Sequence, residues 1–223
     1  MNMKHLAMRA ALLAAGLVFG ITGAFAQAPH THQHSFADAD KWQAVFDDPA
    51  RDAWQKPHEV LTALALKPDA AVADLGAGTG YFSMRLAHFV SRGRVYAVDL
   101  EPAMVTHLAE RAKGMGLSNV TAVQGAPDDA RLPAKVDLVL MVDVYHHIDA
   151  REKYFARLRG SLKPGGRVAV VDFNDASPVG PPRSERLSPG RVKDEMRKAG
   201  YAFVEAHDFL PNQYFLVFRP AKP

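Results

Sequence analysis

The chain has 223 residues, enough for one large domain or two small ones. Hydrophobic residues make up 48% and charged residues 23%, which excludes a largely disordered or collagen-like chain. The net charge is only +3, with no block of lysines or arginines, so there is no electrostatic basis for nucleic-acid binding. The absence of cysteine excludes disulfides, iron–sulfur clusters, thiolate zinc sites and a thiol nucleophile.

Residues 1–26 have the three parts of a secretory signal peptide. Lys4 and Arg9 make the first part basic, residues 10–23 are uncharged and mostly apolar, and Ala24-Phe25-Ala26 forms a cleavage site. The apolar run is shorter than the roughly 20 residues that a membrane-spanning helix needs. The sequence predicts cleavage before Gln27 and an exported chain, periplasmic or secreted, without a stable membrane span. An uncleaved anchor, the alternative, would also place the remaining chain outside.

Residues 27–56 are interpreted as a polar linker followed by an N-terminal lid segment. His30, His32 and His34 alternate in the linker, and imidazoles bind copper or zinc. No carboxylate is fixed beside them, so a flexible linker is preferred and no metal site is predicted. Trp42 and Trp54 are strongly apolar, and we expect the second part to pack on the domain that follows.

Residues 57–223 alternate short apolar runs with segments of helical period, which is typical of a parallel sheet covered by helices on both faces. A long proline- and glycine-containing segment, residues 174–190, predicts a lid. The last two strands are joined by Leu210-Pro211-Asn212 and predict a closing hairpin. The predicted strands are 71–75, 94–99, 120–124, 136–142, 167–172, 202–208 and 213–218, and the predicted helices are 79–91, 102–113, 150–162 and 189–199.

Three glycines follow the first predicted strand. Gly76, Gly78 and Gly80 stand at alternate positions before a helix, where glycine lets the backbone turn sharply and approach a ligand closely. Asp99 ends the second predicted strand, where a carboxylate accepts both hydroxyls of a ribose. Together these features indicate a ligand that contains adenosine.

Asp74 decides between two such ligands. A dinucleotide site favours the spacing G-x-G-x-x-G, whereas this chain has G-x-G-x-G. The Asp74 carboxylate, just before the glycines, would repel a pyrophosphate but would receive the amino group of an amino-acid moiety. This chemistry favours S-adenosylmethionine over NAD.

Four segments, in order, resemble the motifs of class I S-adenosylmethionine-dependent methyltransferases: ADLGAGTGYFS, VYAVDLEP, VDLVLMVDVYHHI and LKPGGRVAVVDF. The similarity covers about residues 60–218 and extends to small exported bacterial methyltransferases of unassigned substrate. The resemblance implies a Rossmann-like α/β sheet of seven strands with helices on both faces and a C-terminal antiparallel hairpin. It also implies S-adenosylmethionine as the cofactor, but it identifies no acceptor.

The resemblance assigns cofactor contacts to individual residues. The implied contacts to the methionine part are Asp74, Gly76, Gly78 and Gly80, and the implied contact to the ribose is Asp99. Leu100 and Met104 are expected beside the adenine. The further contacts that the resemblance implies are Tyr81, Gly125, Ala126, Asp128 and Asp143. Ala126 stands where an acid commonly meets the adenine amino group. Asp128 or Asp129 compensates, or backbone and packing hold the adenine; we favour compensation, because forgoing the contact costs roughly 1–3 kcal/mol.

Methyl transfer needs an aligned acceptor and, for some acceptors, a base. Candidates lie at the end of the fourth strand, where parallel sheets bind ligands. If that strand persists to about Tyr145, its side chains alternate, and the pattern predicts Asp143 and His146 at the acceptor and His147 turned inward as a structural residue. The alternative is that both histidines merely stabilise the loop.

The acceptor pocket is predicted to be walled by Trp42, Phe46, Trp54 and residues 174–190. Aromatic walls suit a flat or lipophilic small molecule, whereas Arg183 and Arg186 suit an anion unless they form a solvated face. The sequence identifies neither the acceptor nor an oligomeric state. Two other classes stay open: an exported noncatalytic nucleoside-binding protein, and a His-rich metal-handling protein.

Overall fold

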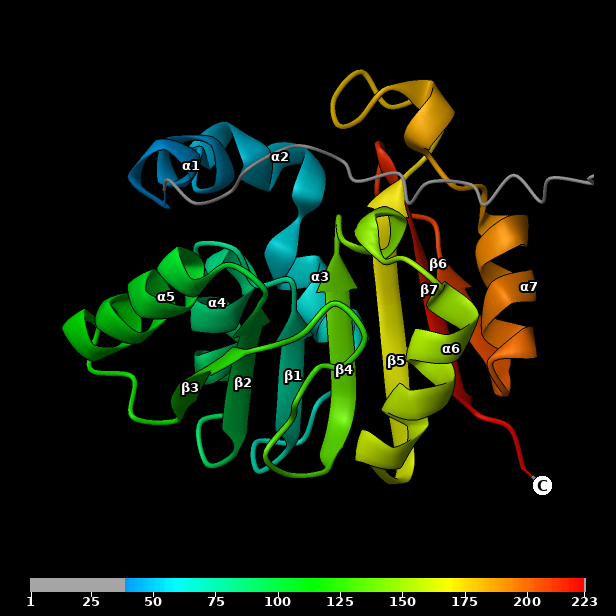
Figure 1. Ribbon diagram of the computed structural model, residues 1–223. Coiled ribbons are helices and arrows are strands. Elements are labelled where there is room, and N and C mark those ends of the chain that lie inside the picture. Colours follow the sequence, from blue (N-terminus) through cyan, green and yellow to red (C-terminus); the bar gives the residue numbers. More distant parts are fainter. Residues whose placement is uncertain (1–38, 223) are drawn as a thin grey trace, which may run out of the picture. The chain divides into compact units, whose positions relative to one another are not determined.

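Seven strands form one sheet in the order β3-β2-β1-β4-β5-β7-β6 (Figure 1). The computed structural model describes residues 39–222, which belong to one compact unit, residues 32–223. Neighbours from β3 to β5 pair in parallel, and β7 runs antiparallel to both β5 and β6. The strands are β1 (Ala71–Leu75), β2 (Arg94–Asp99), β3 (Val120–Gln124), β4 (Val136–Val142), β5 (Leu162–Phe173), β6 (Tyr201–His207) and β7 (Gln213–Pro220). The predicted sheet and terminal hairpin are confirmed.

Helices cover both faces of this sheet because its central strands are apolar on both sides. One core cluster joins α3 and α4 to one face, and a second joins α6 and α7 to the other. The α-helices are α1 (Ala39–Phe46), α2 (Asp52–Gln55), α3 (Pro57–Ala63), α4 (Tyr81–Phe89), α5 (Pro102–Gly114), α6 (Arg151–Leu158) and α7 (Pro189–Lys198). Four 3₁₀ turns are η1 (Pro49–Arg51), η2 (Tyr145–His147), η3 (Arg159–Ser161) and η4 (Arg183–Glu185). None of these helices is long and apolar enough to cross a membrane.

Several predicted boundaries were wrong. The helix predicted over 150–162 ends at Leu158, and β5 already begins at Leu162, where it pairs with Val136 before an irregularity in register. β4 ends at Val142 rather than near Tyr145, because Asp143 adopts a left-handed backbone conformation (φ 60°) and a 3₁₀ turn follows. Strand alternation therefore does not orient the residues after Val142.

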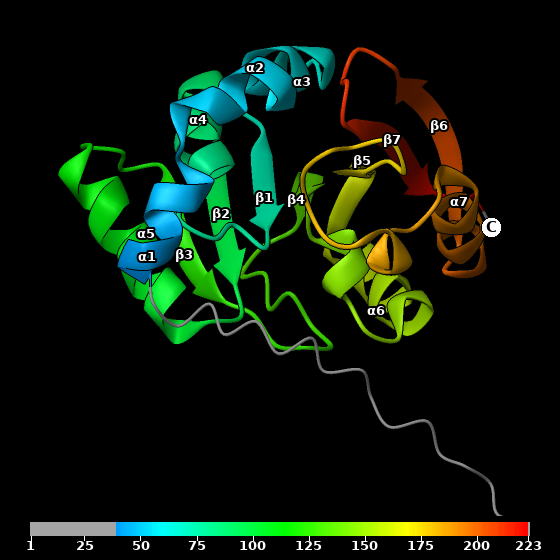
Figure 2. The ribbon, with the colours of Figure 1, turned by 90° about the horizontal axis from the view of Figure 1, so that it is seen from above.

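The parallel strands end at the edge of the sheet that carries the N-terminal helices α1 and α2 and the 174–190 loop. Figures 1 and 2 show α1 and α2 beyond the ends of β1 and β2, and the loop beyond the end of β5. Phe46, the last residue of α1, lies close to Gly78 in the glycine segment that follows β1. The structure thus brings the candidate residues from β1, β2, β4 and β5 to one edge.

Candidate cofactor and acceptor site

The glycine loop is fastened to β2. The amides of Gly76 and Ala77 both donate to the Val98 carbonyl, at 2.8 and 2.9 Å. Gly78 has φ +55°, and a Cβ there would lie 3.3 Å from the ring of Phe46 in α1. A side chain at this position would be strained and would crowd the ring, so the loop requires glycine here.

The Asp99 carboxylate faces the glycine loop from the end of β2. Its Oδ2 accepts a hydrogen bond from the Gly78 amide at 2.8 Å, and its Oδ1 accepts one from the Glu101 amide at 3.0 Å. Burial raises the pKa of Asp99, and these amides oppose the rise. An acceptor-only carboxylate held at this edge suits a diol, as the sequence predicted for ribose.

Asp74 lies at the end of β1, two residues before the first glycine of the loop. Its side chain is buried and accepts a hydrogen bond from the Ser83 hydroxyl at 2.6 Å. Burial raises the pKa of Asp74 to about 6; the charge of Asp99 adds to the rise, and that of Arg51 opposes it. Two carboxylates therefore lie beside the loop, a setting that repels pyrophosphate and attracts a cationic group.

The residues predicted to hold adenine differ in their exposure and in their contacts. Leu100 is 53% exposed, so its side chain is accessible to adenine, whereas Met104 is fully buried. Gly125 donates its amide to the Asp99 carbonyl at 2.9 Å. The carboxylate of Asp128 contacts Arg157 at 2.8 Å and is mostly exposed. Compensation by Asp128 stays a prediction, and this ion pair gives it no support.

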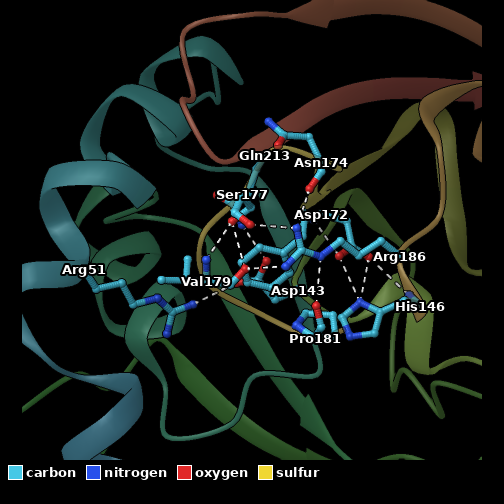
Figure 3. Close-up of polar contacts among 11 residues, drawn as sticks. Arg51, Asp143, His146, Asp172, Asn174, Ser177, Val179, Pro181, Arg186 and Gln213 are labelled. Atoms are coloured by element: carbon cyan, nitrogen blue, oxygen red, sulfur yellow. Dashed lines mark hydrogen bonds and ion pairs between the residues drawn. The ribbon is translucent and has the colours of Figure 1, made fainter. Parts of the chain in front are cut away.

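A ring of four polar side chains fastens the N-terminal segment to the ends of β4 and β7. Arg51 donates through Nε to Gln55 at 3.0 Å, Gln55 donates to Gln213 at 2.7 Å, and Gln213 donates to Asp143. Arg51 closes the ring through Nη2, 3.3 Å from the other oxygen of Asp143 (Figure 3). Both oxygens of Asp143 are therefore engaged.

The same segment also contacts the glycine loop and its helix. Asp47 pairs with Arg111 at 2.5 Å, and the same arginine donates to the Thr79 carbonyl. The Tyr81 hydroxyl donates to Asp52, and the Arg51 guanidinium lies 4.4 Å from the Tyr81 ring centroid. Residues 46–55 thus pack on the domain, as the sequence predicted for the tryptophan-containing part.

His146 is buried, which reverses one expectation. Its side chain is only 3% exposed, and its Nδ1 lies 2.9 and 3.0 Å from the two oxygens of Asp172 in β5. His147 is exposed, with its ring 4.0 Å from that of His146. The expectation that His147 turns inward was wrong, because the chain leaves the strand conformation at Asp143 instead of near Tyr145.

Charge and burial shift the pKa values of this group of residues. Burial raises the pKa of Asp143 to about 7 against the opposing charge of Arg51, and the charge of Asp172 adds to the rise. Burial lowers the pKa of His146, but the hydrogen bond and charge of Asp172, with the charges of Asp143 and Glu185, outweigh burial and raise it. The site therefore holds a carboxyl group and an imidazole whose pKa values are both raised.

The 174–190 loop is organised by Arg186. Its guanidinium donates to four carbonyls of the loop, at 2.8–3.0 Å: those of Asn174, Ser177, Val179 and Pro181 (Figure 3). Arg186 therefore supports the loop instead of offering an anion site, whereas Arg183 is exposed. The aromatic residues lie in two pairs, Trp42 with Phe46 and Trp54 with Phe173.

Sequence reasoning missed four polar residues of this site: Arg51, Gln55, Asp172 and Gln213. Their partners are far apart along the chain, so no local motif marks them. Tyr214 was also missed; its buried hydroxyl has no hydrogen-bond partner within the described part of the chain, and its register partner is Asp172. Three or more metal-ligating side chains do not converge anywhere in residues 39–222, and His30, His32 and His34 lie outside them.

Comparison with known proteins identifies the domain. Residues 72–166 match the sequence profile of a family described as "Methyltransferase domain". A solved S-adenosylmethionine-dependent methyltransferase from Aquifex aeolicus superposes with a TM-score of 0.75 and 26% identity, over 81% of this chain and 97% of that one. The chain carries a class I S-adenosylmethionine-dependent methyltransferase domain. Its family's cofactor is S-adenosylmethionine, as the glycine loop and the two carboxylates predicted.

Two curated relatives are methyltransferases named for different acceptors. Release factor glutamine methyltransferase of Moorella thermoacetica is 38% identical over 78 residues, 34% of this chain and 28% of the relative. Trans-aconitate 2-methyltransferase of Rhodopseudomonas palustris is 29% identical over 133 residues, 60% of this chain and 48% of the relative. The chain thus matches between about a quarter and a half of the length of these relatives.

Three structural observations show that the residues of this site fit S-adenosylmethionine. The three glycines have positive φ, and Phe46 lies so close to Gly78 that a side chain there would crowd its ring. The loop therefore offers a cofactor its backbone without side chains. Asp99 offers acceptor oxygens for a diol, and Asp74 offers a buried carboxylate for an ammonium group. These residues would hold the ribose and the amino-acid part respectively.

Proposed function

We propose that this protein transfers a methyl group from S-adenosylmethionine to a small-molecule acceptor. The observation that carries the proposal is the placement of Asp74 and Asp99 at the ends of β1 and β2, beside a glycine loop whose backbone Asp99 and β2 fix. The cofactor supplies a methyl group that is already activated by its sulfonium. What this chain contributes is therefore binding, exclusion of water and control of the acceptor's proton.

Each part of the site supports one of these contributions. Asp99 binds the ribose, and Asp74 receives the amino group. The segment held by Arg51 and Gln55 covers the glycine loop, so that water is kept from the reacting groups. Asp143 and His146, the two groups with perturbed pKa values beside this segment, are the candidates for proton transfer.

A transfer assay tests the proposal. The full-length chain is incubated with S-adenosylmethionine labelled in its methyl group and with panels of small phenols, alcohols, amines and carboxylic acids. Label transfer by the wild-type chain that is lost or weakened in the isosteric variant Asp99→Asn supports the proposal. Lack of transfer by a chain that also fails to bind S-adenosylhomocysteine contradicts it.

The acceptor panel includes carboxylic acids for a specific reason. One relative is named for trans-aconitate, a small polycarboxylate. The described site has Arg51 as a cation near the glycine loop, but this arginine is already paired with Asp143. An uncharged acceptor beside the aromatic pair of Trp54 and Phe173 is therefore our first candidate, and a carboxylate is the second.

We further propose that the protein is exported and begins at Gln27. The support is the basic start, the apolar run and Ala24-Phe25-Ala26 in residues 1–26, which lie outside the described residues. Intact-mass measurement on protein from cell fractions tests both parts. A cytoplasmic protein that retains residues 1–26 contradicts both, whereas an envelope-bound protein that retains them contradicts cleavage alone.

A further inference from the structure

Asp172 holds His146 at three points. One oxygen of Asp172 accepts the backbone amide of His146 at 3.2 Å, and both oxygens lie within 3.0 Å of Nδ1 of the same residue. The amide of Phe173 donates to the carboxylate at 2.8 Å and fixes it in turn. Both side chains are nearly buried, at 3% and 4% exposure, so this contact is shielded from water.

This geometry selects the tautomer of the imidazole. An ionised carboxylate only accepts hydrogen bonds, so Nδ1 of His146 must carry the hydrogen. The lone pair of the neutral ring is then on Nε2. Asp143, the other candidate base, has both oxygens engaged by Arg51 and Gln213. No hydrogen bond of the described residues occupies Nε2 of His146, which makes this atom the available proton acceptor.

We propose that Asp172 is a positioning residue that orients His146 so that Nε2 removes a proton from the methyl acceptor. The inference rests on the proposed function and deepens it, because a base is needed only for an acceptor that must lose a proton, and the acceptor we propose carries an O–H group. The hydroxyl proton passes to Nε2 while the oxygen forms a bond to the methyl carbon. The bond from that carbon to sulfur breaks, and its electron pair leaves with S-adenosylhomocysteine; the imidazolium then loses its proton to water.

The charged groups around His146 favour this role. Asp172 faces it from β5, Asp143 from the end of β4 and Glu185 from η4, and all three favour the protonated ring. His147, on the same turn, is the nearest other titratable ring. The acidic neighbours compensate for burial, so the ring accepts a proton where an isolated buried histidine would resist it.

Nuclear magnetic resonance of the full-length chain, labelled with ¹⁵N in histidine, tests the positioning directly. His146→Gln assigns the signal. In the wild-type protein we expect the neutral ring, observed above the pH at which His146 loses its proton, to be the Nδ1–H tautomer, and in Asp172→Asn we expect the proton affinity of His146 to fall roughly tenfold or more. Asp175, an exposed carboxylate three residues further along the chain in the 174–190 loop, provides the matched control Asp175→Asn, which should leave the titration unchanged.

The Nε2–H tautomer in the wild-type protein overturns the proposal, and so does a His146 titration that Asp172→Asn does not move. The tautomer measurement needs no variant, so it decides the case even where Asp172→Asn fails to fold. Calorimetry with S-adenosylhomocysteine on the same sample separates this result from the proposed function. Binding with the wrong tautomer refutes the positioning alone, whereas the right tautomer without binding refutes the methyltransferase proposal alone.

Discussion

The guanidinium of Arg51 lies 3.3 Å from the carboxylate of Asp143, which is 92 residues away along the chain. Both side chains are mostly buried, at 14% and 17% exposure. The contact joins the N-terminal segment to the end of β4, where the acceptor is expected. It therefore couples the segment that covers the cofactor site to Asp143, whose pKa burial raises to about 7.

Removing this cation should destabilise the fold. Arg51→Gln leaves a buried carboxylate without its counter-charge and breaks the ring that includes Gln55, so we expect a loss of about 1–3 kcal/mol in the free energy of unfolding. Urea denaturation at pH 8 measures it. Arg85→Gln is the control, because its pair with Asp52 is much more exposed and should contribute about 0–1 kcal/mol. Equal losses in the two variants would contradict the importance of the buried pair.

The raised pKa of Asp143 predicts a pH dependence with a definite sign. The folded-state pKa of about 7 lies above the unfolded value of about 3.9, so the folded chain binds this proton more tightly. The contribution of Asp143 to stability is fully present below pH 4 and is lost as the pH rises to about 7. Relative to wild type, Asp143→Asn should therefore gain about 1 kcal/mol or more between pH 5 and 7.5. A relative loss over this interval would mean that attraction to Arg51 outweighs burial.

His146 and His147 should differ in stability as well as in activity. Because His146 is buried on Asp172, His146→Gln should lower the unfolding free energy by about 1–3 kcal/mol and, with a hydroxyl acceptor, lower kcat by about 10²- to 10⁴-fold. His147→Gln replaces an exposed ring and should change stability by less than about 0.5 kcal/mol. Denaturation and the labelled-methyl assay measure the two effects. A larger loss of stability in the His147 variant would contradict this assignment.

Arg186 should control the order of the 174–190 loop. Arg186→Ala leaves four loop carbonyls without their donor, so we expect faster proteolysis within residues 174–186 and a lower Tm. Arg183→Ala removes an exposed arginine of the same loop and is the control. Limited proteolysis followed by mass spectrometry locates the cuts. A loop equally resistant in both variants would show that other contacts suffice.

The sequence predicted the part of the site that is local in the chain. The glycines, Asp74 and Asp99 lie at the ends of the first two strands, and their spacing alone indicates an adenosine ligand. The four-membered ring and the Asp172–His146 contact could not be predicted, because they join segments that only the folded sheet brings together. The reversal of the two histidines has a local cause: the left-handed conformation of Asp143, a residue that tolerates it better than most.

The expectation that Asp128 or Asp129 replaces the acid missing at position 126 is tested by their contacts. Asp128 and Asp129 follow Gly125 by three and four residues, and the sequence therefore favours one of them as a contact to adenine. The bridge between Ala126 and Asp129 turns this segment back on itself, and Arg157 in α6 contacts both carboxylates. Calorimetry on Asp128→Asn tests the compensation: a roughly tenfold loss of affinity for S-adenosylhomocysteine would support a direct contact with adenine. An affinity close to that of wild type would contradict it.

Isothermal titration calorimetry with S-adenosylhomocysteine and NAD tests the central claim most directly. The full-length chain should bind S-adenosylhomocysteine at one site and give no binding heat with NAD. Asp99→Asn should weaken binding by roughly tenfold or more, because it removes a charge-assisted contact to the ribose worth about 1.5–3 kcal/mol. Binding of NAD in preference to S-adenosylhomocysteine, or unchanged affinity in Asp99→Asn, would contradict the account of this site.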